Sequence, residues 1–111
     1  MLPEPPYYAV IFTSQLRNEH PQDYDSTAEA MLSLARTMHG YLGFESARES
    51  SFGVAISYWD SLEAIAHWRD HEQHRSARDR GRAQWYAHFD LRVARVERQY
   101  SWSFVAPEQG K

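Results

Sequence analysis

Four runs of β-branched and aromatic residues predict four β-strands, at residues 7–14, 41–48, 54–59 and 89–99. The segment 49–53, which contains Gly53, is interpreted as a hairpin loop between the second and third strands. The first and third runs, YYAVIFTS and VAISYW, are apolar at both odd and even positions. Because side chains alternate between the two faces of a strand, this pattern predicts that both faces of these strands are buried.

A helical pattern lies between the first two strands. Ser26 and Glu29 have the spacing of a capping box, which predicts that the helix begins there. Gly40 stands where a C-terminal cap would end it. Apolar residues recur between these signals at helical spacing: Ala28, Met31, Leu34, Ala35 and Met38.

Two further helical runs, at about residues 61–71 and 74–87, lie between the third and fourth strands. Gly81 falls inside the second run, where it costs about 1 kcal/mol relative to alanine. A close approach of the helix to the sheet at Gly81 would offset that cost.

The order β-α-β-β-α-β predicts an α+β, ferredoxin-like fold. It has a four-stranded antiparallel sheet with the helical segments on one face. The strands that are apolar on both faces also need a cover on the second face, and the chain has no remaining segment to supply it. The simplest cover is a second copy, which predicts a homodimer whose two sheets pack into a dimeric α+β barrel.

The length of 111 residues predicts one domain spanning residues 1–111, with its core at about 7–100, a proline-rich arm at 1–6 and a tail at 103–111. A net charge of −3 argues against general binding of nucleic acid. The sequence shows no apolar run of membrane-spanning length and no signal peptide, so we expect no membrane association and a cytoplasmic location. The absence of cysteine excludes disulfides, thiol catalysis and Cys-based metal sites.

Three histidines, His67, His71 and His74, have the i, i+4, i+7 spacing that a metal site on a helix would use. On a continuous helix they lie opposite the apolar stripe of Leu62 and Ile65 and face water, so we expect no bound metal. A helix break near His71 would change this phase. His71 and His74 are therefore candidates for the rim of a pocket.

Three aromatic residues of the same stretch are candidates for binding a substrate. Trp68 lies on the flank of its helix, where it either packs over the sheet edge or forms a pocket wall that stacks on a planar ligand. Trp85 is interpreted first as a core residue and second as a ligand contact. Tyr58 and Trp59 end the third strand on opposite faces, so one must face the helices and the other the partner subunit.

The remaining polar signals carry little chemistry. Four arginines, Arg75, Arg78, Arg80 and Arg82, alternate with acidic residues and are interpreted as a solvated, ion-paired helix surface. The sequence has neither a glycine-rich phosphate loop nor a nucleophile elbow, so bound nucleotide and flavin are not supported and we expect no cofactor.

The order of elements, together with the segments GYLGFESARES, GVAISYWDSLEAIAHWRDHEQHRSARDRGRAQWY and LRVARVERQY, resembles the antibiotic biosynthesis monooxygenase family. The resemblance covers about residues 7–100 and implies a dimeric α+β barrel. It also implies a pocket between the helices and the sheet. Members of that family include cofactor-free oxygenases of polycyclic phenols and quinols, haem-degrading oxygenases, and proteins without a known activity.

The haem-degrading branch carries an Asn on the first strand, a Trp on the helix and a haem-ligating His ten residues after that Trp. Trp68 matches the Trp position, but Arg78 stands at the His position and the first strand has no Asn. His74 is near the His position, though at the wrong spacing. Haem cleavage is therefore the least supported of the activities that the resemblance implies.

We expect a cofactor-independent monooxygenase that acts on a planar, electron-rich aromatic such as a phenol or quinol. His71 or His74 is the predicted base, Trp68 and Phe12 are the predicted pocket walls, and Tyr58 and Trp85 complete the predicted substrate-binding set. Two alternatives stay open: a non-catalytic dimer that binds a small hydrophobic molecule, and a haem-degrading monooxygenase.

Overall fold

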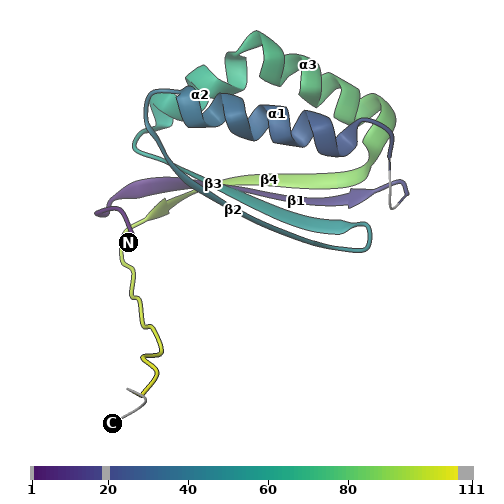
Figure 1. Ribbon diagram of the computed structural model, residues 1–111. Helices are drawn as coiled ribbons and strands as arrows, with labels where there is room; N and C mark the ends of the chain where they lie inside the picture. The colour runs from purple at the N-terminus through teal and green to yellow at the C-terminus, as the bar shows by residue number, and fades with distance from the viewer. Residues whose placement is uncertain (1, 19–20, 108–111) are drawn as a thin grey trace.

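The computed structural model describes residues 2–18 and 21–107, and it confirms the α+β, ferredoxin-like fold (Figure 1). Two short helices and a π-helical turn stand where a single second helix would complete the motif. The elements in chain order are β1 (Tyr7–Leu16), α1 (Tyr24–Thr37), β2 (Tyr41–Glu49), β3 (Phe52–Trp59), α2 (Leu62–Asp70), α3 (Glu72–Arg80), η1 (Gly81–Trp85) and β4 (Tyr86–Val96).

The four strands form one antiparallel sheet in the order β2-β3-β1-β4. The helices of the described residues all lie on one face of this sheet, and none of them lies on the opposite face, which we call the helix-free face (Figure 1). In the register, Phe12 of β1 stands opposite Ala55 of β3 and Leu91 of β4. Directly paired residues point to the same face, so the register decides which side chains meet the helices.

The core joins the sheet to α1 and α2. Trp59 is fully buried, and it packs with Val10 of β1, Ala35 of α1, and Ala64 and Ile65 of α2. Helix α2 begins where Ser61 accepts a hydrogen bond from the Ala64 amide at 3.0 Å, as an N-cap should.

Gly40 sits in the turn that follows α1, with φ at 89°. A Cβ at this position would lie 2.5 Å from the Cβ of Ala64 and 2.5 Å from a carboxylate oxygen of Asp60. Only glycine therefore allows α2 to pack this closely against the turn.

Helix α1 does not begin with the predicted capping box. It starts at Tyr24, after Asp23 with φ at 62°, and the Ser26 hydroxyl donates to the Asp23 carbonyl at 3.2 Å instead of capping an amide. The helix ends at Thr37, so Gly40 lies in the following turn and is not the residue that ends the helix.

Other boundaries also differ from the prediction. Strands β2 and β3 extend to a two-residue turn at Ser50 and Ser51, because Ser50 adopts a left-handed φ of 53° and closes a tight hairpin. Helix α3 ends at Arg80, and β4 begins at Tyr86 rather than near residue 89. The expected close approach at Gly81 is to the side chain of Tyr86, since a Cβ there would lie 2.6 Å from that ring.

No helix of the described part of the chain is long and apolar enough to cross a membrane.

Candidate functional site

A stack of three rings joins the end of β3 to α2 and α3. With Arg78 we call it the Trp68 cluster: Trp59, Trp68, His74 and Arg78. The Trp68 ring lies 5.1 Å from the Trp59 ring and 4.2 Å from the His74 ring, centroid to centroid, with interplanar angles of 31° and 35°. Trp59 is fully buried, whereas Trp68 and His74 are half-buried. The cluster therefore runs from the core to a partly open edge of the helix layer.

The break between α2 and α3 creates this stack. His71 has an extended backbone, with φ −62° and ψ 137°, and separates the two helices. On one continuous helix, residues 68 and 74 would point about 120° apart, at about 100° per residue. The break changes the phase, so the condition under which all three histidines would face water is not met, and His74 is half-buried.

The surroundings of His74 determine its protonation. Its Nδ1 lies 3.3 Å from the Arg69 carbonyl oxygen, and a carbonyl can only accept, so Nδ1 carries the proton. Burial lowers the pKa of His74 below its usual 6.5, with the charges of Arg78 and His71 acting in the same direction and the bond to Arg69 opposing them. His74 is therefore neutral at pH 7, and Nε2 is the nitrogen able to accept a proton.

Two hydrogen-bond donors in the Trp68 cluster lack a partner among the described residues: Nε1 of Trp68 and Nε of Arg78, both buried. An unsatisfied buried donor costs about 1–3 kcal/mol, and more when it is charged. A bound molecule that presents an oxygen acceptor to these donors would recover that cost.

Arg78 is the residue of this site that the sequence interpretation missed, because it was grouped with the solvated arginines. It is only half-exposed, and its charge acts on His74. The available signal was its spacing, since Arg78 follows His74 by four residues and such residues share one helix face.

The other two histidines have different positions. His71 uses Nδ1 to accept a hydrogen bond from the Gln73 amide at 3.2 Å, which caps α3. His67 is exposed on α2. Within residues 2–18 and 21–107, the structure brings no three His, Cys, Asp or Glu side chains together as a metal site.

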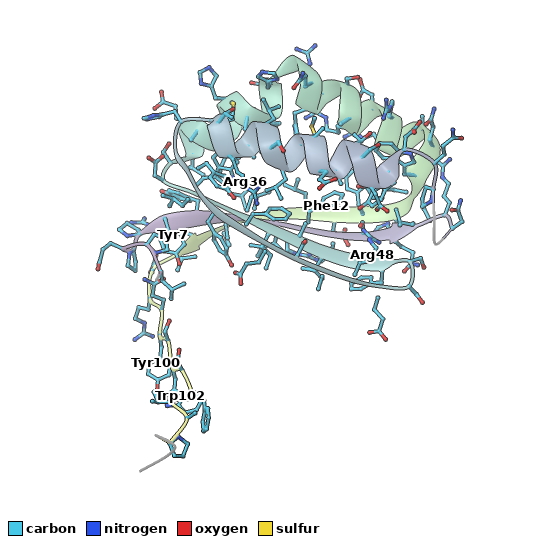
Figure 2. All side chains as sticks on the ribbon, viewed as in Figure 1. Tyr7, Phe12, Arg36, Arg48, Tyr100 and Trp102 are labelled. Atoms are coloured by element: carbon cyan, nitrogen blue, oxygen red, sulfur yellow. The ribbon has the colours of Figure 1, made fainter. Side chains whose placement is uncertain are left out.

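A second group of rings lies farther along the sheet, and we call it the Trp85 cluster: Phe12, Tyr24, Trp85, Tyr86 and Phe89. Ring centroids lie 5.2 Å apart for Phe12 and Phe89, and 5.4 Å apart for both Phe12–Tyr86 and Tyr24–Trp85. Figure 2 shows Phe12 between the helix layer and the sheet.

The polar groups of the Trp85 cluster are paired. Trp85 is 4% exposed, and its Nε1 donates to the Gln22 carbonyl at 3.1 Å. Arg48 donates to the Tyr24 hydroxyl at 2.8 Å and to the Ser14 hydroxyl at 3.2 Å. Burial and a hydrogen bond with Tyr24 raise the pKa of Tyr86, so this phenol stays neutral.

The predicted site residues thus fall into three places. His74 and Trp68 meet, with His71 between their helices, while Phe12 and Trp85 belong to the Trp85 cluster. Phe12 stands opposite Ala55, four residues from Trp59 along β3, which corresponds to about 13 Å at 3.3 Å per residue. The structure does not bring Phe12 to Trp68 as facing walls.

Tyr58 lies on the helix-free face, since it pairs with Ala9 while Trp59 pairs with Tyr8. Its hydroxyl donates to a Glu45 carboxylate oxygen at 2.7 Å. Burial, with the bond and charge of Glu45, raises the pKa of Tyr58 to about 12. Tyr58 therefore faces away from both aromatic clusters.

A groove of about 290 Å³ lies between α1 and α3, apart from these clusters. Its lining consists of small and polar residues together with Met31 and Arg80, and it includes none of the predicted site residues: Ser26, Thr27, Ala30, Met31, Gln73, Ser76, Ala77 and Arg80.

Comparison with known proteins agrees with this architecture. SnoaB, a cofactor-independent oxygenase from Streptomyces nogalater, superposes with a TM-score of 0.73 at 13% identity, covering 86% of this chain and 97% of that one. PA3566 from Pseudomonas aeruginosa gives a TM-score of 0.69 at 14% identity, with 86% and 97% covered. At these identities the likeness shows the fold alone.

The sequence comparisons show the family. The uncharacterized protein YqjZ of Bacillus subtilis (strain 168) is 52% identical over 98 residues, which cover 87% of this chain and 85% of that protein. The model of the family described as antibiotic biosynthesis monooxygenase matches residues 7–80, more than half of the chain. The predicted resemblance is confirmed: this chain belongs to the antibiotic biosynthesis monooxygenase family.

Proposed function

We propose that the protein is a cofactor-independent monooxygenase of a planar aromatic phenol or quinol, and that its site is the Trp68 cluster. One observation carries the proposal: a neutral His74 stacks on Trp68 beside two buried donors that lack a partner among the described residues. This arrangement supplies a base and donors for an oxyanion at the partly exposed edge of the stack, since Trp59 and His74 already lie against the Trp68 ring.

His74 accepts the substrate proton at Nε2. A phenol with a pKa near 10 is a weaker acid than free imidazolium by about 3.5 log units, and the lowered pKa of His74 widens this gap, so the transfer costs at least about 5 kcal/mol. Hydrogen bonds to a charged oxygen contribute about 1.5–3 kcal/mol each. Two bonds from Trp68 Nε1 and Arg78 Nε are therefore enough to offset most of that cost.

The deprotonated ring supplies the electrons for the reaction with dioxygen. One electron passes from the phenolate to O₂, and the resulting ring radical and superoxide combine at a ring carbon. The peroxide takes back the proton held by His74, and loss of water with the hydrogen of the attacked ring carbon leaves a quinone. One oxygen atom therefore enters the ring and the other leaves as water. The substrate itself is the reductant, and the protein contributes binding, deprotonation and exclusion of water.

The family and the fold of a known oxygenase support this proposal. The chain belongs to a family described by monooxygenase activity, and SnoaB, which shares the fold, is a cofactor-independent oxygenase. Arg78 stands where the haem-degrading branch has its ligand histidine. An arginine side chain stays protonated and has no lone pair to bind iron, so haem cleavage is disfavoured.

We propose a homodimer joined through the helix-free face of the sheet. Apolar side chains from β1 and β3 point to that face, where Ile11, Val54 and Ile56 are half-buried and Phe52 is 50% exposed. A second sheet packed on this face would cover them. The absence of cysteine fits a reducing compartment, so we expect the protein to act in the cytoplasm.

Oxygen uptake with dihydroxynaphthalene and anthrone substrates tests the proposed activity. The wild type should consume one O₂ per quinone formed, and His74→Gln should lower kcat/KM at least about 100-fold. His67→Gln, on the exposed side of α2, should retain wild-type activity. Full activity of His74→Gln would exclude His74 as the base. Saturable binding without oxygen uptake would favour the non-catalytic alternative.

A further inference from the structure

The chain continues beyond β4 as an extended segment, residues 97–105, which we call the C-terminal arm. It leaves the sheet at the end near the N-terminus and projects on the side away from the helices (Figure 1). Tyr100, Trp102, Phe104 and Val105 are 87%, 73%, 72% and 84% exposed. Figure 2 shows Tyr100 and Trp102 far from the body of the protein.

The sequence of the arm has the pattern of a strand with one apolar face. Three aromatic residues, Tyr100, Trp102 and Phe104, alternate with Ser101 and Ser103. A period of two places the three rings on one side and the two serines on the other. Folded chains rarely leave a contiguous set of large rings in water, so this side is expected to be an interaction surface.

The body of the same chain offers a surface that matches the arm. Strands β2 and β4 form the two edges of the sheet, and both expose apolar side chains. Leu42 on β2 is 40% exposed, and Leu91 and Val93 on β4 are 54% and 46% exposed. The pairing of Leu91 with Phe12 and of Val93 with Val10 places both β4 side chains on the face that carries the helices. An edge strand also has unpaired backbone groups that an added strand can satisfy.

We propose that in the dimer each C-terminal arm lies along an edge strand of the partner subunit, with its three rings packed on the partner's exposed apolar residues. The arm emerges on the side of the helix-free face, which is where the proposed partner sits. As an added strand beside the edge, it would turn its rings toward the helix-bearing face, where Leu91 and Val93 are exposed.

Gln99 accepts a hydrogen bond from the Tyr7 hydroxyl and donates one to the Pro3 carbonyl, so the arm is anchored there and residues 100–105 are its free part. Six extended residues reach about 20 Å, which is the length of an ordinary strand. The inference rests on the proposed dimer but not on the proposed chemistry.

The surface area that the exchanged arms could bury is a large part of what a stable dimer interface needs. Aromatic side chains bury about 150–250 Å² each, so six rings from two exchanged arms contribute on the order of 1,000 Å². A stable interface buries about 1,200–2,000 Å² in total. The arms would therefore supply a major part of the dimer interface, with the packed sheets supplying the rest.

The experiment compares the wild type with Tyr100→Ser/Trp102→Ser/Phe104→Ser, and uses Ser101→Ala/Ser103→Ala on the opposite side of the arm as the matched control. Analytical ultracentrifugation over a dilution series should give a dimer Kd at least about 100-fold higher for the triple variant, as expected from losing several buried rings. The serine control should match the wild type. Far-UV circular dichroism at high concentration verifies that each variant is folded.

Fluorescence gives a second readout at Trp102. The emission of the wild type should shift to longer wavelength on dilution below the Kd, as Trp102 becomes exposed to water. Trp102→Phe keeps an apolar ring and should dimerise without this shift. An unchanged dimer Kd in the triple variant would exclude the proposed role of the arm, while the proposed dimer through the helix-free face would remain supported. A monomeric wild type would overturn both, and neither result bears on oxygen uptake.

Discussion

The two aromatic clusters are built from similar residues, but they differ in how their polar groups are satisfied. In the Trp85 cluster, the indole donates to a backbone carbonyl, and Arg48 bonds two hydroxyls. In the Trp68 cluster, the corresponding indole and guanidinium nitrogens are buried without a partner among the described residues. The Trp85 cluster is complete by itself, whereas the Trp68 cluster has donors available for another molecule.

This difference separates structural from functional aromatic residues better than composition does. A cluster whose hydrogen-bond donors all have partners, which we call saturated, stabilises the folded state through its buried area and its hydrogen bonds. An unsaturated cluster is less stable than its packing would allow, and binding can recover the difference. Substitutions in the Trp85 cluster should therefore affect stability, and substitutions in the Trp68 cluster should affect ligand binding and activity.

Truncation of the two tryptophans should show the largest contrast. Trp85→Ala removes a ring that is 4% exposed and should lower the free energy of unfolding by about 3–5 kcal/mol. Trp68→Ala removes a half-buried ring and should cost about 1–2 kcal/mol. Urea unfolding followed by far-UV circular dichroism measures both. Equal losses would mean that both rings contribute equally to stability, which would contradict the proposed difference between the two clusters.

Replacing Arg48 should lower the free energy of unfolding, whereas replacing Arg78 should leave it unchanged or raise it. Arg48→Met loses bonds to Tyr24, to Ser14 and to the Ser51 carbonyl, and because Arg48 is exposed the loss should be about 1–2 kcal/mol. Arg78→Met removes a buried donor without a described partner. It should leave the stability unchanged or raise it by up to about 1 kcal/mol. A clear loss in Arg78→Met would show that the guanidinium is satisfied within the protein.

Ligand binding should depend on Trp68 by a smaller amount. A planar dihydroxynaphthalene bound against the exposed edge of this ring should quench the tryptophan fluorescence in a saturable way. Trp68→Ala should abolish most of the quenching and weaken binding by about 1 kcal/mol, or about fivefold, through the lost ring-edge contact and the lost buried area. Calorimetry of both proteins measures the affinity independently of the fluorophore. Trp102→Phe is the control, because it removes an indole outside the Trp68 cluster.

The sequence was sufficient for the fold because the decisive signals are local. Runs of β-branched and aromatic residues, YYAVIFTS and VAISYW, mark β1 and β3, and helical spacing of the apolar residues marks α1. The start of α1 was missed because Asp23 enters the helix through a left-handed φ of 62°, which a capping-box pattern does not reveal.

The candidate site was only partly predictable, since it depends on one backbone angle. Helical phase assigns His74 to solvent unless the chain breaks at His71, and the ψ of 137° at that residue is stabilised by the cap that its own side chain makes with Gln73. His74 and Trp68 were named as candidates, but their contact could not be derived from spacing. The position of Arg78 could not be derived for the same reason, because Arg78 points to the same side of α3 as His74.

The titration of His74 should give the smallest of these effects, which is a change in folding stability with pH. Its pKa is lowered in the folded state by burial, so between that value and about 6.5 the unfolded chain binds a proton that the folded chain does not. Stability is therefore fully present above about pH 6.5 and falls as the pH decreases toward the folded-state pKa.

Urea midpoints measured at pH 7.5 and pH 5.5 test this. The midpoint should fall less on acidification in His74→Gln than in the wild type. The exposed His67→Gln should show the same fall as the wild type. The same titration should govern catalysis, because only neutral His74 accepts the substrate proton. Activity should stay constant from pH 7 upward and decline only in acid. An activity that rises through pH 7–8 would require a base other than His74, and the unsaturated donors of the Trp68 cluster would then act on binding alone.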